Sequence, residues 1–132
     1  MNTPRPLFWL SGLCSTVSAV VAAEVPRVAP EEAARRVAAG EAILIDVREP
    51  DEWAETGVAA PAELLPMSDF NGEGVQWAPF LKAHEGKPLI LYCRSGNRSG
   101  KVAAALKAKG IDASNGGSLA EWQAAGLPVR KP

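Results

Sequence analysis

The sequence has 132 residues, a length that suits one domain. It is 47% hydrophobic and 22% charged, and 14 Lys and Arg nearly balance 15 Asp and Glu. Because the basic residues are scattered along the chain, the composition argues against a nucleic-acid-binding protein.

The first 23 residues have the pattern of a secretory signal peptide. Arg5 is the only charged side chain before Glu24, and residues 7–23 are all apolar or small. We expect cleavage after Ala23. The remaining domain, residues 24–132, would then be periplasmic or secreted. The alternative is an uncleaved membrane anchor, for which this apolar segment is short. Cleavage would leave Cys93 as the only cysteine, and a lone thiol is unusual in an oxidising compartment.

Predicted helices and strands alternate along the rest of the chain. Acidic first turns, basic last turns and glycine stops predict helices at residues 30–39, 49–55, 99–109 and 119–125. Short apolar runs predict strands buried on both faces at 42–47 and 88–92, and weaker patterns predict strands at 63–66 and 111–113. Loop-forming residues dominate 67–79, with a short helix ending at residue 83. This alternation predicts an α/β domain with a mainly parallel sheet.

Cys93 directly follows the predicted strand at 88–92 and precedes a predicted helix. In a parallel α/β sheet such a loop lies at the carboxyl ends of the strands, where ligands bind. The N–H groups at the helix start, together with Arg94 and Arg98, favour thiolate over thiol, and Gly96 lets the loop curl into an anion-binding nest. The pattern therefore indicates a reactive nucleophile, although a buried and inert thiol is the commoner role of a single cysteine.

Four motifs, in this order, resemble the rhodanese-like family: DVREPDEW (46–53), YCRSGNRS (92–99), NGGSLAEW (115–122) and AGLPV (125–129). The resemblance runs from about Val25 to Val129 and is to the single-domain, exported type. It implies a three-layer α/β fold with a central, mainly parallel sheet flanked by helices, and the activity of a thiosulfate sulfurtransferase. Cys93 would take sulfur from thiosulfate or a similar donor as a persulfide and pass it to cyanide or a thiol. It also implies that Asp46 and Arg48 form a structural charge pair.

The resemblance and the predicted nest together make Cys93 the catalytic residue. They predict that the donor is bound by Arg94, Ser95, Gly96, Asn97 and Arg98. The loop from Cys93 to Arg98 has six residues, whereas related phosphatases and arsenate reductases have a longer loop because phosphate needs a wider one. Two alternatives stay open: a cysteine-dependent phosphatase or arsenate reductase, and a non-catalytic module that binds an anion or a partner.

One segment departs from the family pattern. Residues 57–62 read GVAAPA where the family usually has Gly-His-Ile-Pro-Gly-Ala, which puts the course of residues 63–66 in doubt. We expect a monomer with no cofactor and, after signal removal, no membrane contact. We also expect no metal site, because His84 and one cysteine are too few ligands for structural zinc. Trp53, Trp77 and Trp122 are expected to pack in the core or against a pocket wall.

Overall fold

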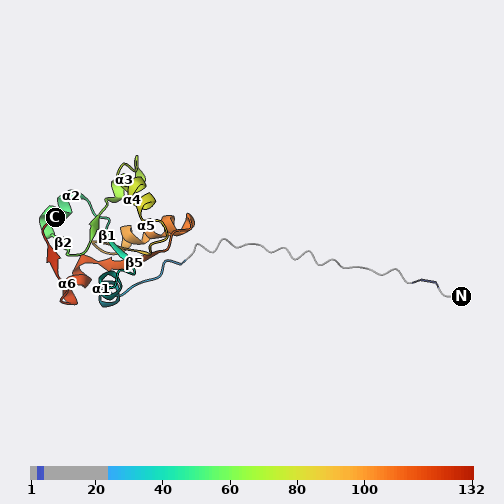
Figure 1. Ribbon diagram of the computed structural model, residues 1–132, viewed down its shortest axis with the longest axis horizontal. Helices are drawn as coiled ribbons and strands as arrows, with labels where there is room; N and C mark the ends of the chain where they lie inside the picture. The colour runs from blue at the N-terminus through green and yellow to red at the C-terminus, as the bar shows by residue number, and fades with distance from the viewer. Residues whose placement is uncertain (1–2, 5–23) are drawn as a thin grey trace.

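The computed structural model describes residues 3–4 and 24–132 (Figure 1). The predicted signal peptide and its cleavage site lie almost entirely outside the described residues, so both stay predictions. Within the described part of the chain, no helix has the length and apolar character needed to cross a membrane.

A parallel sheet of four strands forms the centre of the domain, in the order β3-β1-β4-β5. Its strands are β1 (Ile43–Asp46), β3 (Glu63–Leu64), β4 (Leu89–Cys93) and β5 (Ala113–Ser118). β4 lies between β1 and β5 and is buried at every position, as expected for its continuous apolar run. A smaller antiparallel pair joins β2 (Val58–Ala59) to β6 (Val129–Arg130).

Helices cover both faces of the sheet (Figure 1). They are α1 (Pro30–Ala38), α2 (Pro50–Thr56), α3 (Met67–Asn71), α4 (Trp77–Ala83), α5 (Asn97–Ala108) and α6 (Leu119–Ala124). Successive strand residues point to opposite faces, so Leu89 and Leu91 pack in a core with α4 and α5. Ile90 and Tyr92 belong to a second core with α1 and α6. The predicted three-layer α/β fold is therefore confirmed.

Three predicted elements differ from the structure. The strand predicted at 111–113 lies further along, at 113–118, where the sequence ASNGGS has little intrinsic strand preference. This segment pairs with β4, and a Cβ on Gly116 would come within 2.9 Å of the Ile90 side chain, so close packing rather than local propensity forms the strand. Residues 67–71 form α3 instead of a loop, and α5 begins at Asn97 rather than near Ser99.

The segment that lacks the family histidine is held by the carboxyl end of the chain. Ala60 N donates to Pro128 O at 2.9 Å, and Arg130 donates to the carbonyl oxygens of Ala60 and Ala62, both at 2.9 Å. The chain then enters β3, which pairs with β1. The strand predicted at 63–66 is therefore confirmed in shorter form, at 63–64.

Candidate active site

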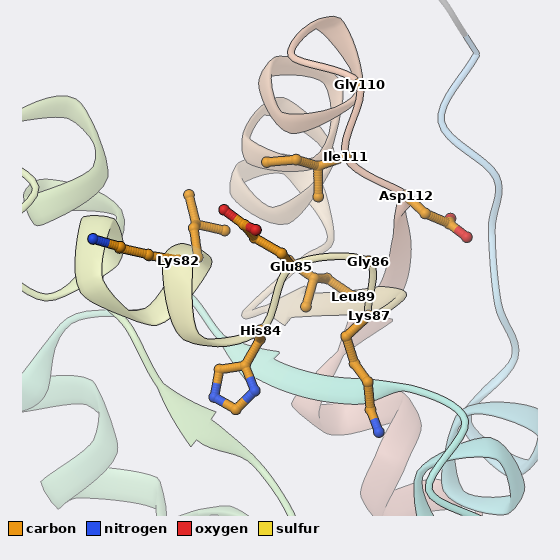
Figure 2. Close-up of a pocket in the computed structure, with 10 residues that line it drawn as sticks. Lys82, His84, Glu85, Gly86, Lys87, Leu89, Gly110, Ile111 and Asp112 are labelled. Carbon is orange, nitrogen blue, oxygen red and sulfur yellow. The ribbon is translucent and has the colours of Figure 1, made fainter.

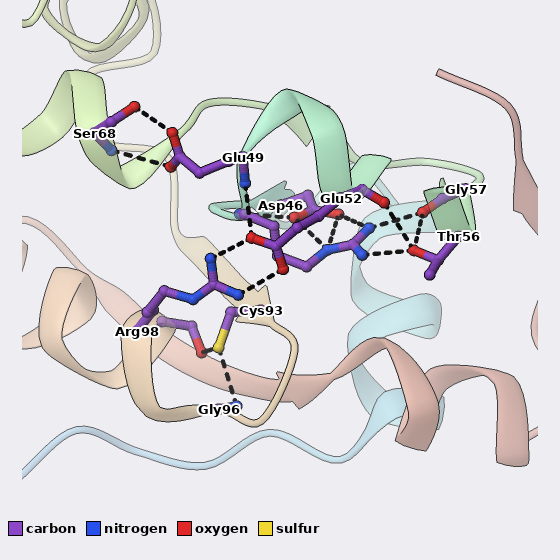
Figure 3. A network of polar contacts seen from close by, with 11 residues as sticks. Asp46, Glu49, Glu52, Thr56, Gly57, Ser68, Cys93, Gly96 and Arg98 are labelled. Carbon is purple, nitrogen blue, oxygen red and sulfur yellow. Dashed lines mark hydrogen bonds and ion pairs between the residues drawn. The ribbon is translucent and has the colours of Figure 1, made fainter. Parts of the chain in front are cut away.

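Cys93 is the last residue of β4 and is fully buried at the carboxyl edge of the sheet. The chain turns back over it, and α5 begins directly after Gly96. Gly96 has a left-handed backbone with φ of 92°, and a Cβ there would come within 2.9 Å of the Arg27 guanidinium. This turn aims Gly96 N at Cys93 Sγ, at 3.0 Å (Figure 3).

Hydrogen-bond donors around Sγ favour the thiolate. Burial raises the pKa of the Cys93 thiol, but the Ser99 hydroxyl and the backbone N–H groups of Ser99, Ser95 and Gly96 lower it by more, so the pKa lies below its usual value. Ser99 Oγ lies 3.4 Å from Sγ. The loop therefore supplies the converging donors that an anionic sulfur needs.

Arg98 is held by an acidic side chain that the sequence analysis did not single out. Its Nη1 and Nη2 donate to the two carboxylate oxygens of Glu52 on α2, at 2.5 and 2.8 Å (Figure 3). The hydrogen bond from Arg98 lowers the pKa of Glu52 to about 2. Much of the Arg98 charge is thus balanced by Glu52, and its predicted part in donor binding stays a prediction. The only signal for Glu52 was its place in the DVREPDEW motif.

The remaining predicted donor-binding side chains lie on the exposed side of the loop. Arg94, Ser95 and Asn97 are exposed, and Asn97 N donates to Ser95 Oγ at 3.3 Å. Arg94 also lines a pocket of about 190 Å³ between α2 and the start of α6. Glu55 and Gln123 face the same pocket, so it carries both charged and neutral polar groups.

The predicted charge pair of Asp46 and Arg48 is confirmed and is almost completely buried, with 0% and 3% of the side chains exposed. Arg48 Nη2 lies 2.8 Å from Asp46 Oδ2 and also donates to Gly57 O, while Nη1 donates to Thr56 Oγ1. The pair therefore joins the end of β1 to the end of α2. Because α2 also carries Glu52, the Asp46–Arg48 pair helps to hold Glu52 in position to contact Arg98.

Asn115 on β5 forms hydrogen bonds with the Cys93 loop and with the first turn of α5. Its Nδ2 donates to Gly96 O at 2.8 Å, and its Oδ1 lies 2.8 Å from Ser99 Oγ. Arg27, on the segment that pairs with Asn115, places its guanidinium beside Gly96 and forms a weak ion pair with Glu121 at 3.4 Å. Asn115 stood in a recognised motif without a role, and nothing in the sequence pointed to Arg27.

A second pocket, of about 430 Å³, lies at the opposite end of the sheet (Figure 2). It is bordered by Leu89 at the start of β4, by His84 after α4 and by Asp112 before β5. His84 packs against Phe80, with ring centroids 4.5 Å apart. Among residues 3–4 and 24–132, His, Cys, Asp and Glu side chains form no group able to hold a metal ion. The donors around Cys93 Sγ make the carboxyl edge of the sheet the candidate active site.

Similar sequences among curated proteins include the following two. An uncharacterised protein of Synechocystis is 40% identical over 92 residues, which are 67% of this chain and 47% of that protein. A probable adenylyltransferase/sulfurtransferase, MoeZ, of Mycobacterium tuberculosis is 39% identical over 69 residues, which are 52% of this chain and 16% of that protein. The chain thus matches about half of the first relative and a small part of the second.

Solved structures share the fold. A rhodanese-related protein of Thermoplasma volcanium has a TM-score of 0.66 and 24% identity, over 81% of this chain and 99% of that one. A Rhodopseudomonas palustris protein described as a possible tyrosine phosphatase has a TM-score of 0.67 and 20% identity, over 80% and 85%. Because the sequence identities are below 25%, these similarities support the fold alone. A family model for the rhodanese-like domain matches residues 29–125, most of the chain and all of the Cys93 loop, and the protein therefore belongs to the rhodanese-like domain family.

Proposed function

We propose that the protein is a sulfurtransferase that moves a sulfane sulfur from thiosulfate, or a similar small anionic donor, to a thiol or cyanide through a persulfide on Cys93. The observation that carries the proposal is the ring of donors around Sγ, with Gly96 N at 3.0 Å and the Ser99 hydroxyl at 3.4 Å. A sulfurtransferase among the sequence relatives supports the same reaction class.

The reaction has two steps that balance in charge. The Cys93 thiolate attacks the outer sulfur of thiosulfate, the S–S bond of the donor breaks, and sulfite leaves with its electron pair. The negative charge then lies on the outer sulfur of the persulfide, and N–H groups of the loop stabilise it. An acceptor thiolate or cyanide attacks that outer sulfur, and the electron pair of the breaking S–S bond returns to Cys93.

Phosphate chemistry is the weaker candidate for this loop. A phosphate dianion is bound well by a planar guanidinium that offers two parallel N–H bonds. The closing guanidinium here, on Arg98, already donates both such bonds to Glu52. This pairing weakens the binding of any dianion by Arg98, so the preference for a sulfur donor over a phosphate ester or arsenate rests on the six-residue loop.

The test is sulfur loading of the full chain. Incubation with thiosulfate should add one sulfur atom to the peptide that contains Cys93, and cyanide should remove it, as followed by mass spectrometry. Cys93→Ser should abolish both loading and thiocyanate formation. If that variant still consumes thiosulfate, the assignment to Cys93 is wrong.

The alternatives predict different results in the same experiment. Hydrolysis of a small aryl phosphate faster than sulfur transfer would favour a phosphatase, and reduction of arsenate an arsenate reductase. No loading, with anion affinity retained in Cys93→Ser, would favour a non-catalytic binding module.

The proposal extends to where the protein acts and in what form. Export to the periplasm or outside the cell is supported by the apolar N-terminal pattern of residues 7–23. We expect that form to be a monomer. The mass of the protein recovered from each cell fraction would locate the cleavage site, and light scattering would give the oligomeric state.

A further inference from the structure

The side-chain amide of Asn115 can take only one orientation. One end faces Gly96 O at 2.8 Å, and a carbonyl oxygen only accepts hydrogen bonds. The other end faces Gly117 N at 3.0 Å, and a backbone N–H only donates. The NH₂ group must therefore face Gly96 and the oxygen Oδ1 must face Gly117 and Ser99. Asn115 is 8% exposed, so solvent does not take over these contacts.

The Ser99 hydroxyl then has one proton and two acceptors. Asn115 Oδ1 lies 2.8 Å from Ser99 Oγ, and Cys93 Sγ lies 3.4 Å from it. When Cys93 is a thiol, its S–H can donate to Ser99 Oγ while the hydroxyl donates to Oδ1, and every group is satisfied. When Cys93 is a thiolate, Sγ can only accept, and it competes with Oδ1 for the same proton.

We propose that Asn115 is a positioning residue that governs how readily Cys93 loses its proton, by competing with Sγ for the Ser99 proton while holding Gly96 N toward Sγ. The inference rests on the proposed function, because it concerns Cys93 reacting as a thiolate. When the thiolate forms, the Ser99 hydroxyl turns to Sγ and leaves Oγ and Oδ1 without a proton between them. When sulfur is loaded, the charge moves to the outer sulfur, and the Ser99 proton returns to Asn115.

Charged groups also surround this network and affect the same ionisation. They come from the loop, the two flanking helices, the end of β1 and the N-terminal segment: Arg94, the Arg98–Glu52 pair, the Asp46–Arg48 pair and Arg27. None of these groups is replaced in the variants, and the cycle measures only the part of the shift that depends on both Ser99 and Asn115.

The test is a double-mutant cycle on the rate at which iodoacetamide alkylates Cys93, measured from pH 5 to 10 by the mass of the Cys93 peptide. Ser99→Ala should raise the midpoint of this profile by about one pH unit, because the thiolate loses a donor. The shift that Asn115→Ala causes should lie further toward low pH when Ser99 is present than in the Ser99→Ala background, by about half a unit or more. Equal shifts in the two backgrounds would overturn the competition.

Ser114→Ala is the matched control. Ser114 is a buried serine on β5, next to Asn115. Its hydroxyl faces Leu89 O, at 3.5 Å, rather than Cys93. It should leave the midpoint unchanged, and an upward shift equal to that of Ser99→Ala would mean that any lost buried hydroxyl disturbs the site.

A second variant keeps the test decisive if Asn115→Ala does not fold. Asn115→Asp has the same shape, loses the donor to Gly96 O in both backgrounds alike, and attracts the Ser99 proton more strongly, so it should raise the midpoint more with Ser99 than without it. Alkylation by iodoacetamide needs no sulfur donor, so the cycle tests the role of Asn115 independently of the proposed sulfur transfer. Coupling without sulfur loading would refute the proposed function alone, and sulfur loading without coupling would refute the role of Asn115 alone.

Discussion

The Glu52–Arg98 ion pair ties α2 to the helix that follows the Cys93 loop, and Glu52→Gln tests how strongly. The pair is partly shielded from water, with 20% of the Glu52 side chain and 31% of the Arg98 side chain exposed. Glu52 also accepts a hydrogen bond from Glu49 N at 3.3 Å, which completes the capping box at the start of α2. Glutamine keeps the size and one acceptor oxygen but removes the charge.

The magnitude follows from the pKa of Glu52, which falls from 4.5 to about 2. A shift of about 2.5 units, at about 1.36 kcal/mol per unit, sets an upper limit of about 3.4 kcal/mol. Partial exposure and the hydrogen bond that glutamine retains reduce the expected loss to about 1–2 kcal/mol. Because the folded-state pKa is depressed, this stability is present above the unfolded pKa of 4.5 and is lost as pH falls through about 2.

Urea unfolding at pH 7 and at pH 3 measures the effect. Glu52→Gln should lower the free energy of unfolding by about 1–2 kcal/mol at pH 7, and the gap should shrink by about half at pH 3. Glu55→Gln is the control, since Glu55 is exposed on the same helix and forms no ion pair among the residues that the structure describes. A gap that does not change with pH, or one no larger than that of Glu55→Gln, would refute the reasoning.

Three further substitutions test the frame around the site, each by urea unfolding. Asp46→Asn leaves the buried Arg48 charge without its partner and should cost about 3 kcal/mol, and a loss below about 1 kcal/mol would contradict a structural pair. Gly117→Ala should cost about 1–2 kcal/mol, because φ is 86° and the new Cβ would come within 2.9 Å of the Glu121 carboxylate; a neutral effect would exclude that strain. Ser118→Ala should cost about 1 kcal/mol by removing the N-cap of α6, where Ser118 Oγ accepts from Glu121 N at 3.1 Å, and unchanged stability would show that water replaces the cap.

Local patterns were sufficient for the elements whose residues carry a strong periodic or apolar signal. β1 and β4 were predictable because each is a continuous apolar run, and α5 because its buried positions recur with helical spacing. β5 was misplaced because glycine and polar residues form a strand only where a neighbouring strand pairs with them. The short strands β2 and β6 were missed for the same reason, since each is defined by its pairing with a segment about seventy residues away.

By itself, the sequence determined the α/β class, the position of Cys93 at the end of a buried strand, and the six-residue loop, because these depend on residues that are neighbours in the chain. Only the tertiary structure decided which distant side chains meet that loop. Glu52 reaches Arg98 from α2, and Asn115 reaches Gly96 and Ser99 from β5. Such contacts join residues that are far apart in the chain, so no local pattern of residue types predicts which acceptor takes a proton or which charge balances a guanidinium.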